Sequence, residues 1–279
     1  MENVKTNKPK IWFITGSSRG FGRVWTQAAL ERGDKVAATA RNIDSISDFK
    51  DKYGDNVLIL PLDVTKAEQV QNAVKTAHEH FGRLDVVINN AGYSLVGTVE
   101  EAKADDIRAM YETNVLGPVA VIQAVLPIMR AQGFGHILGT SSSLGHYTVP
   151  LIGYYCSSKW AFEAIYESLA MEVRSFGIHV SIIEPGAYAT EFGSENSLKF
   201  SANLPEYGSI RNMVFENMGK MQRGNPEATA KAVLQLVDTA EPPLRMFLGS
   251  HNLEEIRQVY SGRIKVWEDW QVVATAAQG

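Results

Sequence analysis

The sequence contains little cysteine, no strong excess of charge and no long apolar segment, and each absence excludes a class of protein. A single cysteine, Cys156, cannot form a disulfide within the chain, so a reducing cytoplasmic environment is expected. The net charge of −4 argues against nucleic acid or an anionic membrane as the main partner. Residues 1–10 are polar, unlike a secretory signal. No apolar run approaches the length of about 20 residues that spans a bilayer, so no membrane partner is expected.

The chain also lacks a histidine pattern typical of metal sites. His78 and His80 are two positions apart on a predicted helix, so their side chains diverge. Either His146 and Tyr147 line a pocket or they are exposed loop residues, and the second is the stronger expectation. Cys156 has no histidine partner at a motif spacing and is expected to be inert packing. No metal site is therefore expected.

Segments typical of strands and of helices alternate along the whole chain. The apolar runs lack a two-residue alternation, as expected for parallel strands that are covered on both faces. The pattern predicts one α/β domain, residues 1–279, with a doubly wound, Rossmann-type parallel sheet and helices on both faces. The expected strands are 10–15, 35–40, 57–61, 84–89, 135–141, 179–184 and 244–248. The clearest helices are 67–81, 105–130 and 155–176.

A glycine-rich turn follows the first expected strand. Residues 16–22 read Gly-Ser-Ser-Arg-Gly-Phe-Gly, and residues 23–32 are expected to form a helix that ends before Gly33. A strand, a glycine turn and a helix start place backbone amides and the positive end of the helix against a phosphate. The glycines allow close approach to a pyrophosphate, although their spacing differs from the usual Gly-x-Gly-x-x-Gly fingerprint.

Tyr155 and Lys159 are separated by four positions, so on a helix they share one face. A nearby positive charge favours the phenolate form, which makes tyrosine a useful acid near neutral pH. Such a tyrosine can protonate a carbonyl oxygen or accept the proton of an alcohol. Tyr154 is the rival candidate, but it cannot share the face that carries Lys159.

Together these motifs resemble the short-chain dehydrogenase/reductase family, single-domain type. The matching pieces, from residue 10 to about 190, are Thr15 to Gly22, Leu62-Asp63-Val64, Asn89-Asn90-Ala91-Gly92, Asn114, Ser142, Tyr155 with Lys159, and Pro185-Gly186 followed by Thr190. Residues 126–130 and 183–190 are most similar to the 17-beta-hydroxysteroid-dehydrogenase-like and retinol-dehydrogenase-like branch. Phe21 departs from the family, which usually has a smaller aliphatic residue there, so the helix start could be displaced.

The resemblance implies hydride transfer between a nicotinamide cofactor and a carbonyl/alcohol pair, with four catalytic residues. Tyr155 would act as the general acid, and Ser142 would hold the substrate oxygen. Lys159 would lower the pKa of the phenol and bind the ribose hydroxyls, and Asn114 would hold a water near Lys159. Ser141 is expected to point elsewhere because side chains alternate along a strand.

The resemblance also implies the cofactor contacts. The expected cofactor-binding residues are Gly16, Ser18, Arg19, Gly20, Phe21, Gly22, Arg41, Asp63, Val64, Asn90, Ala91, Gly92, Asn114, Tyr155, Lys159, Pro185, Gly186, Tyr188 and Thr190. In an NAD site the second strand ends in an acidic residue that binds the ribose 2′-hydroxyl. Ala40 stands at that position, followed by Arg41, and Arg19 lies in the glycine turn. Two guanidiniums and no carboxylate favour a 2′-phosphate, and therefore NADP(H).

Two segments fall outside the alternating pattern. Residues 191–223 are expected to form a substrate lid, with a surface helix pair as the alternative, because hydride transfer requires that water be excluded. The tail from residue 251 to 279 has Val259, Ile264, Trp267 and Trp270 at roughly helical spacing, which favours core packing or a subunit contact. The segments 105–130 and 155–176 carry more apolar residues than one core face needs, so a homodimer or homotetramer is expected.

The sequence therefore predicts an NADPH-dependent oxidoreductase acting on a ketone/aldehyde–alcohol pair, with a medium-sized apolar carbonyl compound as substrate. The alternative is a non-catalytic NADP(H)-binding sensor on the same fold. Such a protein would be expected to lose the tyrosine or the lysine, whereas this chain keeps Asn114, Ser142, Tyr155 and Lys159.

Overall fold

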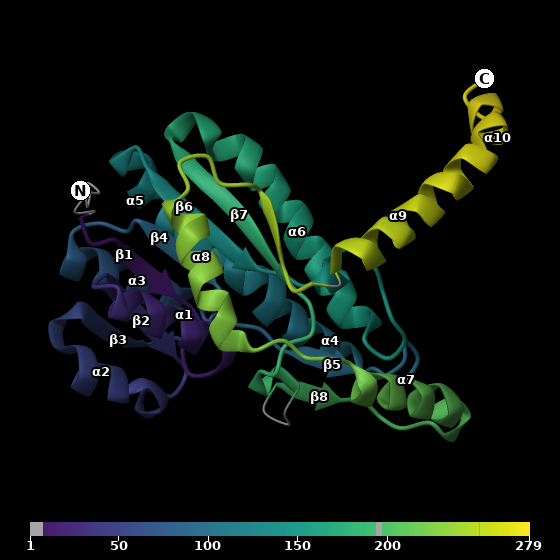
Figure 1. Ribbon diagram of the computed structural model, residues 1–279, viewed down its shortest axis with the longest axis horizontal. Coiled ribbons are helices and arrows are strands. Elements are labelled where there is room, and N and C mark those ends of the chain that lie inside the picture. The colour runs from purple at the N-terminus through teal and green to yellow at the C-terminus, as the bar shows by residue number, and fades with distance from the viewer. Residues whose placement is uncertain (1–7, 194–196, 251) are drawn as a thin grey trace.

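A seven-stranded parallel sheet with the strand order β3-β2-β1-β4-β6-β7-β9 forms the centre of the computed structural model (Figure 1), which describes residues 8–193, 197–250 and 252–279. Its strands are β1 (Ile11–Ile14), β2 (Lys35–Ala40), β3 (Val57–Pro61), β4 (Val86–Asn89), β6 (Gly135–Thr140), β7 (Ile178–Pro185) and β9 (Arg245–Leu248). The order reverses between β1 and β4, which is the switch point of a doubly wound sheet. The predicted fold class is confirmed.

Helices cover both faces of the sheet, and successive side chains of each strand reach opposite cores. Ile11 and Phe13 of β1 join one buried cluster, whereas Trp12 and Ile14 join the other. The first cluster is completed by helices α3 (Ala67–Phe81), α5 (Gly117–Gln132) and α6 (Gly153–Val173). The second is completed by α1 (Gly20–Glu31), α2 (Asp48–Tyr53) and α8 (Thr229–Asp238). The apolar strands lack alternation because both of their faces are buried.

The expected helix over 105–130 is interrupted. It consists of α4 (Ala104–Tyr111), a π-helical turn (Glu112–Leu116) and α5. Pro118 has no N–H to donate to the preceding turn, which explains why the ladder changes there. The helix expected over 155–176 ends at Val173 and continues as a short 3₁₀ turn, Arg174–Phe176. The first helix begins at Gly20, inside the glycine turn.

Two short strands form a second, parallel pair that the sequence analysis missed. They are β5 (Ser94–Val96) and β8 (Leu198–Phe200). Strands of three residues give too short a pattern to be recognised from periodicity. This pair joins the segment after β4 to the expected lid, which continues into α7 (Gly208–Lys220).

Among the described residues, one helical stretch, 104–132, is long and apolar enough by length and composition to cross a bilayer. The expectation that no apolar run approaches this length was therefore wrong. Val121, Val125 and Met129 of this stretch belong to the buried core on the sheet. A buried core helix of a globular domain meets the same criterion.

The C-terminal helices α9 (Asn252–Asp269) and α10 (Gln271–Ala276) project away from the body (Figure 1). Ile256, near the base, is buried, but Trp267 is 63% and Trp270 64% exposed. Ile264 is also exposed. The core packing that was expected is therefore wrong for Ile264, Trp267 and Trp270. A subunit contact of this helix remains a prediction. Residue 251 lies outside the described residues.

Candidate active site

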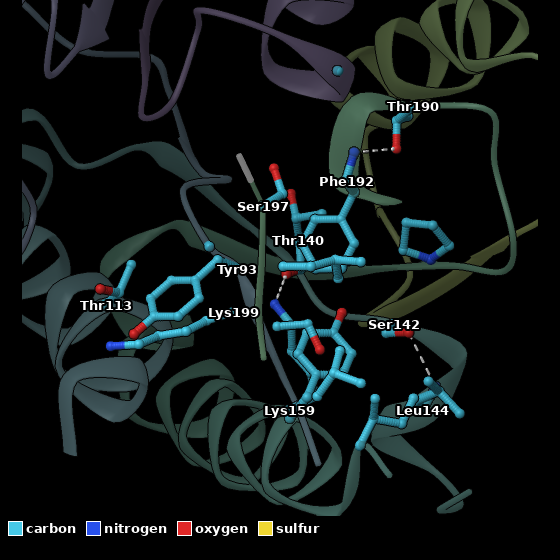
Figure 2. A pocket seen from close by; sticks show the side chains of 18 of the residues that line it. Tyr93, Thr113, Thr140, Ser142, Leu144, Lys159, Thr190, Phe192, Ser197 and Lys199 are labelled. Carbon is cyan, nitrogen blue, oxygen red and sulfur yellow. Dashed lines mark hydrogen bonds between the residues drawn. The ribbon is translucent and has the colours of Figure 1, made fainter. Parts of the chain in front are cut away.

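A cavity of about 1230 Å³ lies at the carboxyl ends of the central strands (Figure 2). Of the expected site residues, Gly22 and Asn114 lie behind its wall and the rest line it. The lining members are Gly16, Ser18, Arg19, Gly20, Phe21, Arg41, Asp63, Val64, Asn90, Ala91, Gly92, Ser142, Tyr155, Lys159, Pro185, Gly186, Tyr188 and Thr190. Segments from the whole chain meet here because parallel strands end at one edge of the sheet.

The glycine turn forms a backbone cradle at one end of this cavity. Gly16 and Gly20 have positive φ angles of 71° and 53°, which glycine adopts without strain. A Cβ atom at Gly22 would overlap the carbonyl oxygen of Gly16, so the close packing of helix on turn requires glycine. The N-terminus of α1 begins in this turn and faces the cavity. The cradle fits a cofactor pyrophosphate, which the exposed amides and the helix dipole would bind.

Asn90 holds the cradle in place. Its Nδ2 donates to the carbonyl oxygens of Thr15 and Gly16, each at 3.2 Å. Thr15 Oγ1 in turn accepts from the backbone amides of Asn90 and Ala91, at 2.9 and 3.1 Å. The Asn90 side chain thus fixes the turn, while the backbone from Asn90 to Gly92 lines the cavity.

Phe21 occupies a defined aromatic site at the start of α1, which begins at Gly20, three residues before the expected Arg23. Its ring stacks on Trp25 at 5.2 Å and meets the edge of Tyr188 at 5.2 Å. Trp25 is buried and donates from Nε1 to Thr229 Oγ1 at 2.8 Å. The aromatic side chain therefore connects α1 with the segment after β7.

The cationic residues predicted to select the cofactor lie at the edge of the same cavity. Arg41 is exposed directly after β2, and Arg19 lines the cavity from the glycine turn. The β2 strand ends at the buried Ala40, so no carboxylate stands at its tip. Asp63 Oδ1 accepts from Thr65 N and Oγ1, at 3.0 and 2.8 Å, which fixes the loop after β3.

The catalytic candidates meet on the opposite wall. Tyr155 and Lys159 are buried on α6, and Lys159 Nζ lies 5.7 Å from the Tyr155 ring centre. Lys159 Nζ donates to the carbonyl oxygen of Thr140 at 2.8 Å (Figure 2). Ser142 caps the short helix Ser143–Gly145, where its Oγ accepts from Leu144 N at 3.2 Å (Figure 2). The Ser142 side chain lies near enough to the Tyr155 phenol to oppose the effect of burial on the pKa of that phenol.

Burial dominates the acidity of this pair. It raises the pKa of Tyr155 above the ordinary value, and the nearby Ser142 side chain only partly opposes it. Burial also lowers the pKa of Lys159 to about 8, against the opposing charge of Glu163. The pKa of the phenol is therefore raised where a lowering was expected, because burial is the largest influence on it. Instead, the phenol is kept protonated and the ammonium titrates near neutral pH.

The rival residues point elsewhere, as expected. Tyr154 donates from its hydroxyl to the carbonyl oxygen of Val99 at 3.1 Å, away from Lys159. Ser141 donates to Glu163 Oε1 at 2.6 Å. The sequence position of Tyr155 on the helix thus selects it for contact with the cavity.

Asn114 lies in the π-helical turn and braces the site from behind. Its Nδ2 donates to Tyr93 O at 2.8 Å and to Ser158 Oγ at 3.2 Å, and its Oδ1 accepts from Tyr93 N at 3.1 Å. A Cβ at Gly92 would lie 3.2 Å from Asn114 Oδ1 and 3.9 Å from Lys159 Nζ. Asn114 and Lys159 therefore both lie close to Gly92.

The rest of the cavity wall is largely apolar and comes mostly from segments with no recognisable motif. Residues 191–223 contribute Phe192, Leu198, Phe200, Met213, Phe215, Met218 and Met221. The ring centre of Phe192 lies 5.6 Å from that of Tyr155. Tyr93, Thr113 and Lys199 line the cavity from another side (Figure 2). Sequence reasoning identified the lid segment, which contains Lys199, but not Tyr93 or Thr113; the only signal for Tyr93 was its position directly after Gly92.

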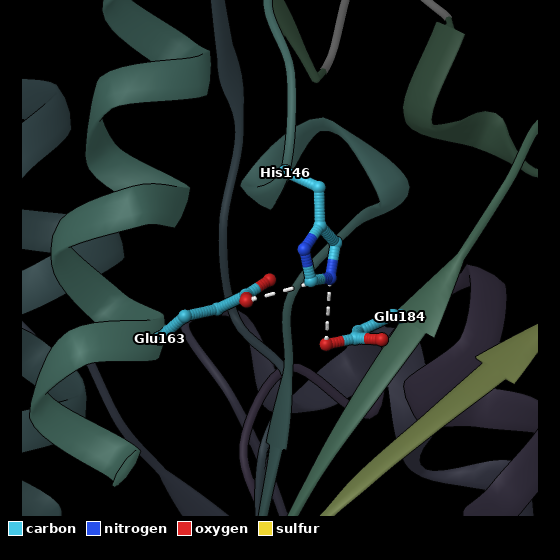
Figure 3. Close-up of side chains that lie close together, drawn as sticks. All are labelled: His146, Glu163 and Glu184. Atoms are coloured by element: carbon cyan, nitrogen blue, oxygen red, sulfur yellow. Dashed lines mark hydrogen bonds and ion pairs between the residues drawn. The ribbon is translucent and has the colours of Figure 1, made fainter. Parts of the chain in front are cut away.

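His146 does not behave as the exposed loop residue that was expected. It is buried, and its Nε2 lies 3.1 Å from Glu184 Oε1 and 3.7 Å from Glu163 Oε2 (Figure 3). Tyr147, the next residue, does line the cavity. The imidazole of His146 and the carboxylates of Glu163 and Glu184 come from distant parts of the chain. No spacing in the sequence therefore predicted that these groups would lie together.

Known proteins are similar to this chain in sequence. The family described as short chain dehydrogenase matches residues 10–199. Oxidoreductase BOA17 of Botryotinia fuckeliana is 40% identical over 267 residues, covering 93% of this chain and 97% of that protein. Retinol dehydrogenase 8 of Bos taurus is 30% identical over 257 residues, covering 85% of this chain and 80% of that protein.

Solved structures share the architecture. A short-chain dehydrogenase from Streptomyces avermitilis has a TM-score of 0.88 and 33% identity, covering 97% of this chain and 99% of that one. An alcohol dehydrogenase from the archaeon Thermococcus sibiricus, complexed with 5-hydroxy-NADP, has a TM-score of 0.71 and 29% identity over 86% of this chain and 96% of that one. With the matched motifs, the sheet order and the Ser142–Tyr155–Lys159 geometry, these relatives show that the chain belongs to the short-chain dehydrogenase/reductase family, whose members are oxidoreductases.

Proposed function

We propose that the chain is an NADPH-dependent reductase that interconverts a ketone or aldehyde and its alcohol, acting on a medium-sized apolar compound. The observation that carries this proposal is the meeting of Tyr155, Ser142 and Lys159 in one cavity that also contains the glycine cradle. A non-catalytic sensor would need the cradle but not the buried phenol. The bound nicotinamide cofactor would supply the hydride.

The chain's own residues would handle the oxygen and the proton. Ser142 and Tyr155 would donate hydrogen bonds to the substrate oxygen, and Tyr155 would transfer its proton as negative charge develops there. Burial keeps the phenol protonated, so it is ready to donate. Lys159 would hold the ribose hydroxyls by its ammonium, which has three donors. The backbone of Gly186 and the Thr190 side chain line the position where the nicotinamide end would lie.

The apolar wall supports an apolar substrate, and residues 191–223 would act as its lid. This segment is fastened to the domain through Glu101, whose Oε1 accepts from Leu204 N at 2.7 Å and pairs with Arg211 of α7. The methionines of α7 can adapt to substrates of different shape. Closure of such a segment would exclude water from hydride transfer.

A panel of apolar ketones and aldehydes tests the function directly. Purified protein is mixed with NADPH and each compound, and the loss of NADPH absorbance is followed. We expect turnover with at least one bulky apolar ketone and little with small hydrophilic ones. Tight NADPH binding without turnover on any member of a broad panel would support the sensor alternative instead.

NADPH affinity should depend on alkaline pH. Lys159 binds the ribose only as an ammonium, and its pKa is lowered to about 8. Raising the pH through this value removes the proton and the charge-assisted hydrogen bonds to the ribose, so the dissociation constant should rise by about tenfold in total and then level off, because the glycine cradle still binds the pyrophosphate. Titrations of NADPH fluorescence on both sides of pH 8 measure this. An affinity that stays constant well above this pH would contradict the assignment of Lys159.

The exposed apolar residues on α6 and before α5 support a homodimer or homotetramer. Leu116 is 50%, Trp160 40% and Met171 73% exposed. Burying such residues between copies would remove apolar surface from water. Light scattering at micromolar concentration should therefore give at least twice the mass of one chain, whereas a mass near 30.7 kDa would contradict it.

A further inference from the structure

A buried ionic cluster lies next to the catalytic residues, and none of its members is among the catalytic and cofactor-binding residues proposed above. Glu163 on α6, His146, Glu184 on β7 and Arg245 on β9 form this cluster, and Figure 3 shows His146 between the two carboxylates. The exposed fractions are 4% for Glu163, 7% for His146 and 0% for Glu184. Buried charges are costly unless they are paired, so this arrangement requires a reason.

The cation of the cluster is Arg245. Its Nη1 lies 2.5 Å from Glu163 Oε2 and 3.1 Å from Glu184 Oε1. His146 Nε2 lies 3.1 Å from Glu184 Oε1, and its Nδ1 lies 3.1 Å from the Tyr260 hydroxyl on α9. The guanidinium thus pairs with both buried carboxylates and partly balances their charge.

Glu163 contacts the chain on both sides of Ser142. Its Oε1 accepts from Ser141 Oγ at 2.6 Å, directly before the catalytic serine. A Cβ at Gly145, three residues after it, would overlap the Glu163 carboxylate. The short helix that Ser142 caps therefore lies between two contacts with one side chain.

Glu163 is also the neighbour of Lys159 on α6. The two residues are four positions apart on the same helix, so their side chains share one face. Lys159 Nζ donates to the carbonyl oxygen of Thr140, and Glu163 Oε1 accepts from Ser141 Oγ. Thr140 and Ser141 are consecutive residues at the end of β6. The charge of Glu163 opposes the lowering of the Lys159 pKa by burial.

The pKa of Glu163 lies above its ordinary value, and burial is the largest cause. Burial raises its pKa, the Ser141 hydroxyl lowers it, and Glu184 raises it. His146 and Arg245 lower it further. With a direct donor and a guanidinium on its two oxygens, the carboxylate form is the one that these contacts satisfy.

We propose that Glu163 is a positioning residue that fixes the segment carrying Ser142 and keeps Lys159 in its charged form. It would touch neither substrate nor cofactor and would act through those two residues. The inference rests on the proposed function in so far as Ser142 and Lys159 perform the roles given to them there.

The decisive variant is Glu163→Gln, since its amide oxygen still accepts from Ser141 while the charge is lost. We expect the pH at which NADPH affinity begins to fall to drop by about one unit, because Lys159 loses its nearest anion. The matched control is Glu167→Gln. Glu167 lies one turn further along α6 and pairs with Arg245 Nη2 at 2.7 Å, but its side chain is 56% exposed. The control should leave this pH unchanged.

An equal pH dependence in wild type, Glu163→Gln and Glu167→Gln would overturn the proposal. If Glu163→Gln does not fold, as judged by circular dichroism, Ser141→Ala replaces it. That variant should lower kcat by about tenfold or more with NADPH affinity unchanged, because the Ser142 segment loses its anchor. An unchanged kcat would then overturn the proposal.

The failure of the inference can be separated from failure of the proposed function. NADPH titrations need no substrate, so a shifted pH dependence in Glu163→Gln supports the link to Lys159 even if no carbonyl compound is reduced. Conversely, ketone reduction by the wild type with no shift in the variant overturns the inference and leaves the function standing.

Discussion

Tyr155→Phe should nearly abolish ketone reduction, lowering kcat by about 100- to 10,000-fold, while NADPH binding stays close to normal. The hydroxyl is the proposed proton donor, and its removal leaves the glycine cradle and Lys159 in place. The ring itself is buried, so phenylalanine fills the same space and the fold should persist. Steady-state kinetics and NADPH titration on the same preparation measure the two effects separately.

Tyr154→Phe is the matched control for this substitution. Tyr154 is adjacent in sequence and also loses a hydroxyl, but that hydroxyl donates to Val99 O outside the catalytic group. Its variant should retain activity within a few-fold of the wild type. An inactive Tyr154→Phe beside an active Tyr155→Phe would show that the helix register of the proposed site is wrong.

The enzyme should prefer NADPH to NADH by at least about tenfold in kcat/KM. Arg41 and Arg19 line the cavity beyond the end of β2, where paired hydrogen bonds to a 2′-phosphate would form. Losing these contacts should cost several kcal/mol, which corresponds to a tenfold effect or more. Kinetics with both cofactors, at matched substrate concentration, give the ratio.

Arg41→Asp should reverse this preference, since a carboxylate can accept from the ribose 2′-hydroxyl and repels a phosphate. Arg108→Asp is the control: it changes the net charge equally, at an exposed residue of α4 that pairs with Asp105. Equal efficiency with NADPH and NADH in the wild type would refute the role of the arginines. An Arg108→Asp variant with the same reversal would show that net charge alone is responsible.

The central sheet could be predicted because it depends on local pattern. The strands covered on both faces are continuous apolar runs, and β2 and β3 have the predicted bounds, residues 35–40 and 57–61. The remaining strands differ from the prediction by one or two residues at one end or both, for example β4, which begins at Val86. Strand ends depend on which backbone groups find partners, and a single sequence does not contain that information.

The motif residues could also be placed, because the carboxyl ends of parallel strands meet at one edge. The pKa shifts of these residues could not be predicted from the sequence. The spacing of Tyr155 and Lys159 suggested an ammonium that acidifies a phenol, whereas the depth of burial makes desolvation the larger effect on Tyr155. Burial depends on every element packed around α6, including the remote lid residue Phe192.

Contacts between segments that are distant in the chain were not predicted from the sequence. The β5–β8 pair joins residues about a hundred positions apart, through strands too short to show periodicity. The cluster of His146, Glu163 and Glu184 joins a loop, a helix and a strand. The apolar residues of α9 suggested core packing, but Trp267 is exposed because the helix leaves the body. Amphipathic pattern shows that a face needs a partner without showing which one.

Isotope transfer tests the central claim, hydride transfer from NADPH to a carbonyl carbon, most directly. The wild type is incubated with NADPH carrying deuterium on the transferred position of the nicotinamide and with an apolar ketone from the panel, and the alcohol is analysed by mass spectrometry. The account predicts an alcohol with one deuterium bonded to the former carbonyl carbon, formed by the wild type and hardly at all by Tyr155→Phe. An alcohol without deuterium, or equal product from Tyr155→Phe, would contradict it.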